Sequence, residues 1–141
     1  TLGYAFPTAL GAKIGTPRRQ VVATSGDGGF GYASSDLATA VQEGISVVTL
    51  GFNNQMLGAS HIEQQNRLGG RVIGTRLHNP DFAQLAELYG AMGIKLNSHE
   101  ELGDALRRAL RADRPVVIEV PIPTLPPPFQ IAPPSLEGPS D

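Results

Sequence analysis

Two short polar segments carry the residue types that could do chemistry in this chain. The first is a glycine-rich loop with a single carboxylate, Asp27. The second is a pair of amides, Asn53 and Asn54, with Met56 two residues further on. Mg²⁺ takes oxygen ligands in octahedral geometry, usually a few from protein and the rest from phosphate and water. The Asp27 carboxylate, the Asn54 amide oxygen and the Met56 carbonyl could supply those few ligands.

The glycine-rich loop also matches the dinucleotide-binding pattern Gly-x-Gly-x-x-Gly, at Gly26, Gly28 and Gly31. The match alone is weak, because Asp27 would repel a pyrophosphate unless a cation lay between them. The acidic residue expected about 20 residues further on is replaced by Asn53. A bound metal removes both objections, and the N–H groups of the loop could take the remaining phosphate charge. A dinucleotide-binding module remains the alternative.

Strands that alternate with helices would place both segments at one edge of a sheet. We expect strands over 20–24, 46–52, 93–96 and 116–120, and helices over 7–14, 35–43, 57–66, 82–89 and 102–109. Strands that are apolar throughout indicate an α/β fold with three layers, in which helices cover both faces of a mostly parallel sheet. Ligands bind at the carboxyl ends of such strands, where both polar segments would lie.

Three of the expected helices begin at capping signals. Ser34–Ser35 could cap the second helix, and Asn79–Pro80 could begin the fourth. Ser98 and Glu101 form a capping-box pattern before the last helix.

Composition narrows the class of protein. The 141 residues are 40% hydrophobic and 17% charged, with a net charge of −2, as in one globular domain. The absence of a basic stripe argues against nucleic acid, and the apolar runs are too short to span a membrane. The chain contains no cysteine, which excludes disulfides and thiolate sites. With no visible signal peptide, we expect a cytoplasmic location.

Proline divides the chain into two parts. Eight of its 12 prolines fall in the last 21 residues, where a fixed φ and a missing N–H disfavour helix and central strand. We therefore expect a folded domain over 1–120 and an extended Pro-rich tail over 121–141. The chain begins within what reads as structure, so we expect it to be a fragment of a larger protein.

The two polar segments resemble the diphosphate motif of thiamine diphosphate (ThDP) enzymes. That motif is Gly-Asp-Gly, here 26–28, followed after 24 residues by the Asn53–Asn54 pair. Residues 26–40, Gly-Asp-Gly-Gly-Phe-Gly-Tyr-Ala-Ser-Ser-Asp-Leu-Ala-Thr-Ala, resemble the acetolactate synthase and benzoylformate decarboxylase group. The segments 2–12, 79–82 and 115–120 fit the same domain, so the resemblance covers roughly 1–123.

This resemblance implies the carboxyl-terminal, diphosphate-binding domain of such an enzyme, with the ThDP-binding fold and with ThDP and Mg²⁺ as cofactors. The metal ligands would be Asp27, Asn54 and the Met56 carbonyl. Leu2 would be the bulky apolar residue beneath the thiazolium ring that forces the cofactor into its V shape. The other cofactor-binding residues would be Gly26, Gly28, Gly29, Phe30, Leu57 and Gly58.

The resemblance also implies that this chain holds only half of a cofactor site. We expect no catalytic residue in it, because the activating glutamate would come from a pyrimidine-binding domain, usually of a partner subunit in a homo-oligomer. The reaction would be decarboxylation or carboligation of a 2-oxo acid, with the chemistry supplied by the cofactor. Gln55, Met56, Leu57 and His61 are the candidates for substrate contact. A regulatory domain that kept the fold and lost catalysis is the third hypothesis.

Overall fold

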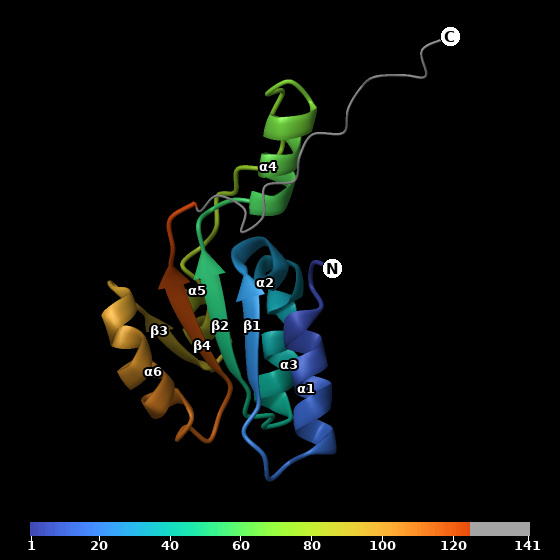
Figure 1. Cartoon of the computed structure of the whole chain (residues 1–141). Helices are drawn as coiled ribbons and strands as arrows, with labels where there is room; N and C mark the ends of the chain where they lie inside the picture. Colours follow the sequence, from blue (N-terminus) through green and yellow to red (C-terminus); the bar gives the residue numbers. More distant parts are fainter. Residues whose placement is uncertain (125–141) are drawn as a thin grey trace.

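A four-stranded parallel sheet forms the centre of the molecule in the computed structural model, which describes residues 1–124 (Figure 1). The strands lie in the order β1 (Val22–Gly26), β2 (Val48–Asn53), β4 (Val116–Pro121) and β3 (Met92–Lys95). All neighbouring pairs are parallel, and Val48 of β2 is in register with both Val22 and Val116. Because the strands run in one direction, their carboxyl ends meet at one edge.

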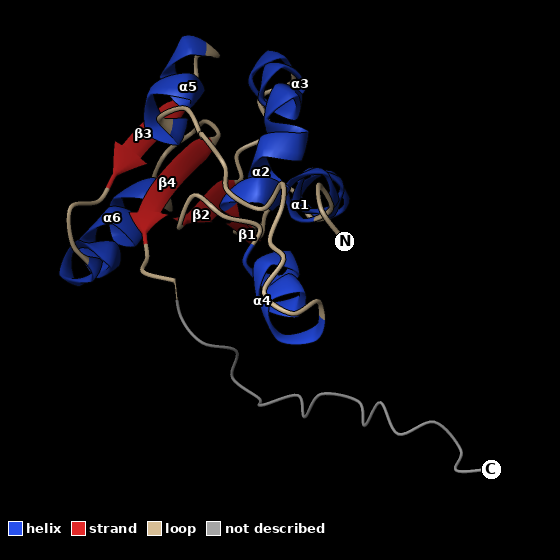
Figure 2. Cartoon of the chain, turned by 90° about the horizontal axis from the view of Figure 1, so that it is seen from above, coloured by secondary structure: helices blue, strands red, loops and turns tan. Residues whose placement is uncertain are grey.

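Helices cover the two faces of this sheet, which confirms the three-layer α/β fold (Figure 2). A single helix, α6, packs on the face that carries Val116 and Ile118, and the other sheet-packing helices cover the opposite face. Two short 3₁₀ turns, η1 and η2, precede α3 and α6. The bounds are α1 (Ala5–Gly15), α2 (Asp27–Ala33), η1 (Ser34–Asp36), α3 (Leu37–Gln42), α5 (Phe82–Leu88), η2 (His99–Glu101) and α6 (Leu102–Ala109).

The two cores lie on opposite faces of the sheet. In the larger core, Phe30 of α2 packs edge-on against Phe6 and Phe82, with ring centroids 5.8 Å and 5.2 Å away. All three rings are almost fully buried. In the smaller core, β4 contributes alternate residues against α6. This alternation leaves Val117 and Glu119 facing the α5 side, and Glu119 departs from the expected purely apolar strand.

The expected strand and helix order is correct, but several boundaries are wrong. β1 and β2 begin two residues later than expected. The segment read as a glycine-rich turn is the first turn of α2, because the helix begins at Asp27, directly after β1. The expected helix over 35–43 begins as the 3₁₀ turn η1 and continues as α3, which ends at Gln42.

The capping residues also differ from those expected. Ser34 bonds to the Gly31 carbonyl and caps no helix. The α5 cap is Asp81, whose Oδ1 accepts the Gln84 N–H at 2.9 Å. The expected box before α6 does not form, since the Glu101 carboxylate accepts the Asn97 backbone N–H at 3.1 Å in place of the Ser98 N–H, and the Ser98 side chain caps nothing.

Cover of the sheet is incomplete at β1. Val22 and Thr24 point to the same face as the smaller core, but α6 does not reach them and both are exposed. At the other end, β4 runs one residue into the predicted tail: Pro121 pairs with Asn53, beyond the last residue of β3. Because β3 has ended there, the absence of an N–H on Pro121 leaves no hydrogen bond to a neighbouring strand unmade. Residues 125–141 of the predicted tail lie outside the described residues.

One glycine brings α5 close to the sheet. A Cβ atom on Gly93 of β3 would lie 2.0 Å from the Ala83 carbonyl oxygen, which is backbone and cannot move aside. The absent side chain thus allows the start of α5 to pack directly against β3.

The excursion between β2 and α5 stands beyond the carboxyl edge of the sheet (Figure 1). Its helix, α4 (Gly58–Arg67), has no buried residue. Backbone bonds anchor its base: the Leu57 N–H donates to the Thr75 carbonyl and the Leu77 N–H to the Gln55 carbonyl, both at 2.8 Å. None of the described helices is long and apolar enough to cross a membrane.

Candidate functional site

A cleft of about 410 Å³ opens where the first turn of α2 meets the start of α4 and the amino terminus of the chain. It lies at the carboxyl edge of the sheet, as the sequence predicts. Most of the predicted cofactor-binding residues line it, namely Leu2, Gly26, Asp27, Gly28, Gly29, Met56, Leu57 and Gly58.

Two predicted residues lie elsewhere. The Phe30 side chain is fully buried between other aromatic rings, so only its backbone could face a ligand. Asn54 lines a neighbouring cavity of about 500 Å³. Met56 lines both cavities and therefore stands between Asp27 and Asn54.

Asp27 is the carboxylate of the cleft, and it is 3% exposed. Its Oδ1 accepts the Gly28 N–H at 2.9 Å. Its Oδ2 accepts the Met56 N–H at 3.0 Å and the Asn79 Nδ2 at 2.8 Å. The bond from Met56 ties the two predicted metal-binding segments together.

No cationic side chain compensates this buried charge in the part of the chain that the structure describes. The ion pairs among the described residues all involve carboxylates other than Asp27. Burying a charge is costly unless it is paired or bound to a metal. Oδ1 has accepted only one hydrogen bond and keeps room for a further partner. The Asp27 environment therefore suits a cation supplied from outside the chain.

The glycines beside Asp27 allow neighbouring side chains to pack closely against the first turn of α2. A Cβ on Gly28 would lie 2.4 Å from Cδ2 of Leu57, and one on Gly29 would lie 2.8 Å from Oγ of Ser25. Leu2, which is 49% exposed, lies beside this strip, its Cδ2 4.0 Å from the Gly29 Cβ position. Backbone N–H groups of a helix start thus border a cleft with an apolar wall, an arrangement that suits an anion.

A strained turn connects the two asparagines to Met56. Gln55 has φ of +56°, a left-handed conformation that non-glycine residues rarely adopt. The Gln55 N–H donates to Oδ1 of Asn53 at 3.0 Å, and its carbonyl accepts from Leu77. These bonds hold the turn in the conformation that follows β2.

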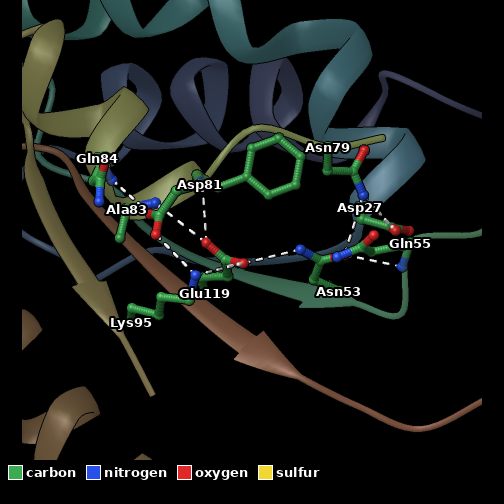
Figure 3. A network of polar contacts seen from close by, with 10 residues as sticks. Asp27, Asn53, Gln55, Asn79, Asp81, Ala83, Gln84, Lys95 and Glu119 are labelled. Atoms are coloured by element: carbon green, nitrogen blue, oxygen red, sulfur yellow. Dashed lines mark hydrogen bonds and ion pairs between the residues drawn. The ribbon is translucent and has the colours of Figure 1, made fainter. Parts of the chain in front are cut away.

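A polar network extends from this turn into the interior (Figure 3). Asn53 donates from Nδ2 to Oε1 of Glu119 at 2.9 Å. The Asn53 Oδ1 is therefore directed to Gln55 and to Nδ2 of Asn79, 3.1 Å away. Glu119 itself is 4% exposed, and its Oε2 accepts the Phe82 N–H at 2.8 Å at the start of α5.

An ion pair closes the outer end of the network (Figure 3). The Lys95 ammonium donates to Oδ2 of Asp81 at 2.8 Å and lies 4.0 Å from the Glu119 carboxylate. The bond from Lys95, supported by the Gln84 N–H, lowers the pKa of Asp81 below its ordinary value. The bond to Asp81, with the nearby Glu119 charge, raises the pKa of Lys95.

Sequence reasoning missed three residues of this region. Asn79 was read as part of a helix start, yet its side chain bonds to Asp27 and Asn53. Glu119 was read as part of an apolar strand, although a carboxylate in such a run is itself a signal of a buried polar contact. Arg76 pairs through its backbone with Met56 and lines the cavity that also holds Asn54; no sequence signal pointed to it.

His61, a candidate for substrate contact, has a structural partner. Its Nδ1 lies 2.9 Å from Oγ1 of the buried Thr75. This contact fastens α4 to the segment that returns from it toward α5. Among the described residues, no three histidine, aspartate or glutamate side chains gather as a metal cluster. The predicted ligand set differs in kind, because it combines one carboxylate with an amide and a carbonyl.

Comparison with known proteins agrees with this geometry. Residues 1–120 match the family described as thiamine pyrophosphate enzyme, C-terminal TPP binding domain; thiamine pyrophosphate is another name for ThDP. The acetolactate synthase large subunit of Haemophilus influenzae is 42% identical over 77% of this chain and 19% of its own length. A sulfoacetaldehyde acetyltransferase of Castellaniella defragrans is 35% identical over 84% of this chain and 20% of its own.

A solved structure has the same fold. The ThDP-dependent 4-hydroxybenzoylformate decarboxylase of Rhodococcus jostii RHA1 matches with a TM-score of 0.81 and 36% identity, over 86% of this chain and 23% of that one. The chain thus spans about a fifth of the length of the curated relatives it matches. It belongs to the C-terminal thiamine pyrophosphate-binding domain family of thiamine pyrophosphate enzymes.

Proposed function

We propose that this domain binds the diphosphate of ThDP through Mg²⁺ and serves a 2-oxo acid decarboxylase or carboligase. The observation that carries the proposal is Asp27, a buried carboxylate without a cationic partner among the described residues, at the edge of a cleft. Family membership favours ThDP over the dinucleotide alternative. A metal bound by Asp27 would neutralise both the buried carboxylate and the diphosphate.

The residues present fit the metal and the diphosphate. Asp27 has acceptor capacity left on Oδ1, and the Asn54 amide oxygen and the Met56 carbonyl offer the hard oxygen ligands that Mg²⁺ prefers. The N–H groups of Gly29 and Phe30 belong to the first turn of α2, where partial positive charge stabilises phosphate, whereas the Gly28 N–H already donates to Asp27. Leu57 and Gly58 would line the rest of the cofactor cleft.

The cofactor supplies the decarboxylation chemistry, and the protein supplies placement and electrostatics. Leu2 lies at the cleft wall and would support the thiazolium ring from below. Gln55, Met56 and Leu57 would stand nearest to a substrate among the predicted contacts, whereas His61 is engaged with Thr75. The remaining half of the cofactor site, including the glutamate that activates the pyrimidine, would come from a pyrimidine-binding domain of the same or a partner subunit.

The substrate class rests on the relatives. They are an acetolactate synthase, a sulfoacetaldehyde acetyltransferase and a 4-hydroxybenzoylformate decarboxylase. We infer a 2-oxo acid substrate, a homo-oligomeric enzyme and a cytoplasmic location for this protein. Restored turnover on addition of a pyrimidine-binding domain would argue against a purely regulatory role.

Calorimetric titration of ThDP tests the proposal in the complete natural polypeptide that contains these residues. We expect binding in Mg²⁺ that is lost in EDTA. Asp27→Ala should weaken Mg²⁺-dependent binding by more than about 100-fold, because loss of an outer-shell partner alone typically costs 10–100-fold.

The matched control is Asp113→Ala. Asp113 is exposed in the loop before β4, at the opposite edge of the sheet, so its loss should leave ThDP affinity unchanged. Undiminished, Mg²⁺-dependent ThDP affinity in a folded Asp27→Ala variant would overturn the proposal. So would equal binding in Mg²⁺ and in EDTA.

A further inference from the structure

Asn79 belongs to the loop before α5, yet its side chain lies between the two polar segments of the site (Figure 3). A single atom, Nδ2, donates to Oδ2 of Asp27 at 2.8 Å and to Oδ1 of Asn53 at 3.1 Å. The two acceptors lie at the ends of different strands: Asp27 directly follows β1, and Asn53 is the last residue of β2. Asn79 thus uses both of its N–H groups to bridge the ends of adjacent strands.

The bridge fixes the orientation of the Asp27 carboxylate. Oδ2 accepts from both Asn79 and the Met56 backbone, so its two lone pairs are occupied. Oδ1 accepts only the Gly28 N–H. Rotation of the carboxylate would break the Asn79 bond, which is charge-assisted and therefore among the stronger hydrogen bonds.

The same bridge supports the strained turn that follows β2. Asn53 Oδ1 holds the Gln55 N–H while Gln55 is in its left-handed conformation. Glu119 accepts from Nδ2 of Asn53, and this bond leaves the amide oxygen of Asn53 directed to Asn79. A displaced Asn53 would release the turn that orients Asn54 and Met56.

We propose that Asn79 is a positioning residue for the metal: it holds the Asp27 carboxylate and the Asn53–Met56 turn at a fixed separation. This inference rests on the proposed Mg²⁺-dependent binding of ThDP. It assigns Asn79 a role beyond the start of α5, where the helix cap is Asp81. Asn79 does not itself bind the metal in this proposal and acts only through Asp27 and the Asn53–Met56 turn.

Comparing two metal ions separates this role from a merely structural one. Mg²⁺ requires near-ideal octahedral geometry, whereas Ca²⁺ accepts irregular and larger coordination shells. A loosened ligand set should therefore lose Mg²⁺ affinity more than Ca²⁺ affinity. A general loss of folded protein would lower both affinities by the same factor.

The experiment titrates Mg²⁺, and separately Ca²⁺, into the complete natural polypeptide at a fixed ThDP concentration, with calorimetry as the readout. We expect Asn79→Ala to weaken Mg²⁺ binding about 10- to 100-fold, as is typical of outer-shell partners. The loss for Ca²⁺ should be several-fold smaller. Asn79→Ser, which keeps one hydroxyl donor, should fall between the alanine variant and the wild type, and it serves if Asn79→Ala does not fold.

Asn97→Ala is the matched control. Asn97 is exposed, and it bonds to Glu101 through its backbone N–H, so both affinities should stay at the wild-type values. Unchanged Mg²⁺ affinity in folded Asn79 variants, or equal losses for both ions, would overturn the inference. If the wild type itself shows no Mg²⁺-dependent binding of ThDP, the proposed function fails instead.

Discussion

Replacing Glu119 with glutamine keeps the shape of the buried side chain but turns one acceptor oxygen into a donor. The carboxylate serves two sets of donors: Asn53 Nδ2 at 2.9 Å on Oε1, and the N–H groups of Phe82 at 2.8 Å and Ala83 at 3.4 Å on Oε2. Glutamine can satisfy one of them and must direct its NH₂ group at the other. A bond to a charged acceptor contributes about 1.5–3 kcal/mol, and a buried donor without a partner costs about 1–3 kcal/mol. We expect Glu119→Gln to lower the free energy of unfolding by about 3 kcal/mol.

Urea-induced unfolding, followed by circular dichroism, measures this change. The midpoint should fall while the slope with urea stays constant, because the surface exposed on unfolding is the same. Glu100→Gln is the control, since Glu100 is exposed and such substitutions usually change stability by less than about 0.5 kcal/mol. A Glu119→Gln variant within that range would refute the reasoning that one carboxylate organises Asn53 and the start of α5.

Three further changes test the packing and the outer ion pair. Gly93→Ala should cost about 3 kcal/mol or more, measured by thermal unfolding, because its Cβ would lie 2.0 Å from the Ala83 carbonyl oxygen. Thr49→Val should raise stability by about 1 kcal/mol, since the buried Thr49 Oγ1 has no hydrogen-bond partner among the described residues; a loss would contradict this. The Asp81–Lys95 bond lowers one pKa from 3.8 and raises the other from 10.5. The difference in free energy of unfolding between the wild type and Lys95→Met, from urea titrations, measures the stabilisation by this bond. It should be constant at pH values between the two ordinary pKa values. It should fall as the pH drops through the lowered pKa or rises through the raised one; a change near neutral pH would contradict the pairing.

The carboxyl-edge location of the site followed from local features of the sequence. Asp27 and Met56 each follow a predicted parallel strand, and parallel strands end at the same edge, so their proximity could be predicted without tertiary information. The structure joins them by a 3.0 Å hydrogen bond. The helical state of the glycine-rich segment was missed because glycine pairs usually indicate a turn, whereas here α2 begins directly at the end of β1.

The network behind the site depends on contacts that no local pattern contains. Asn79 lies 52 residues from Asp27, and Glu119 lies 66 residues from Asn53. Asn79 precedes a proline and a helix, so a role at the start of the helix already accounted for an asparagine at this position. Its amide reaches Asp27 because the loop before α5 lies over the ends of β1 and β2.

The most direct test of the central claim is anomalous diffraction from crystals of the complete natural polypeptide grown with ThDP and Mn²⁺ in place of Mg²⁺. The account predicts one strong manganese peak in the cleft, bound by Oδ1 of Asp27, the Asn54 amide oxygen and the Met56 carbonyl, with diphosphate oxygens completing the shell. A cofactor bound in the cleft with no peak beside Asp27, or a metal held by other residues, would contradict it.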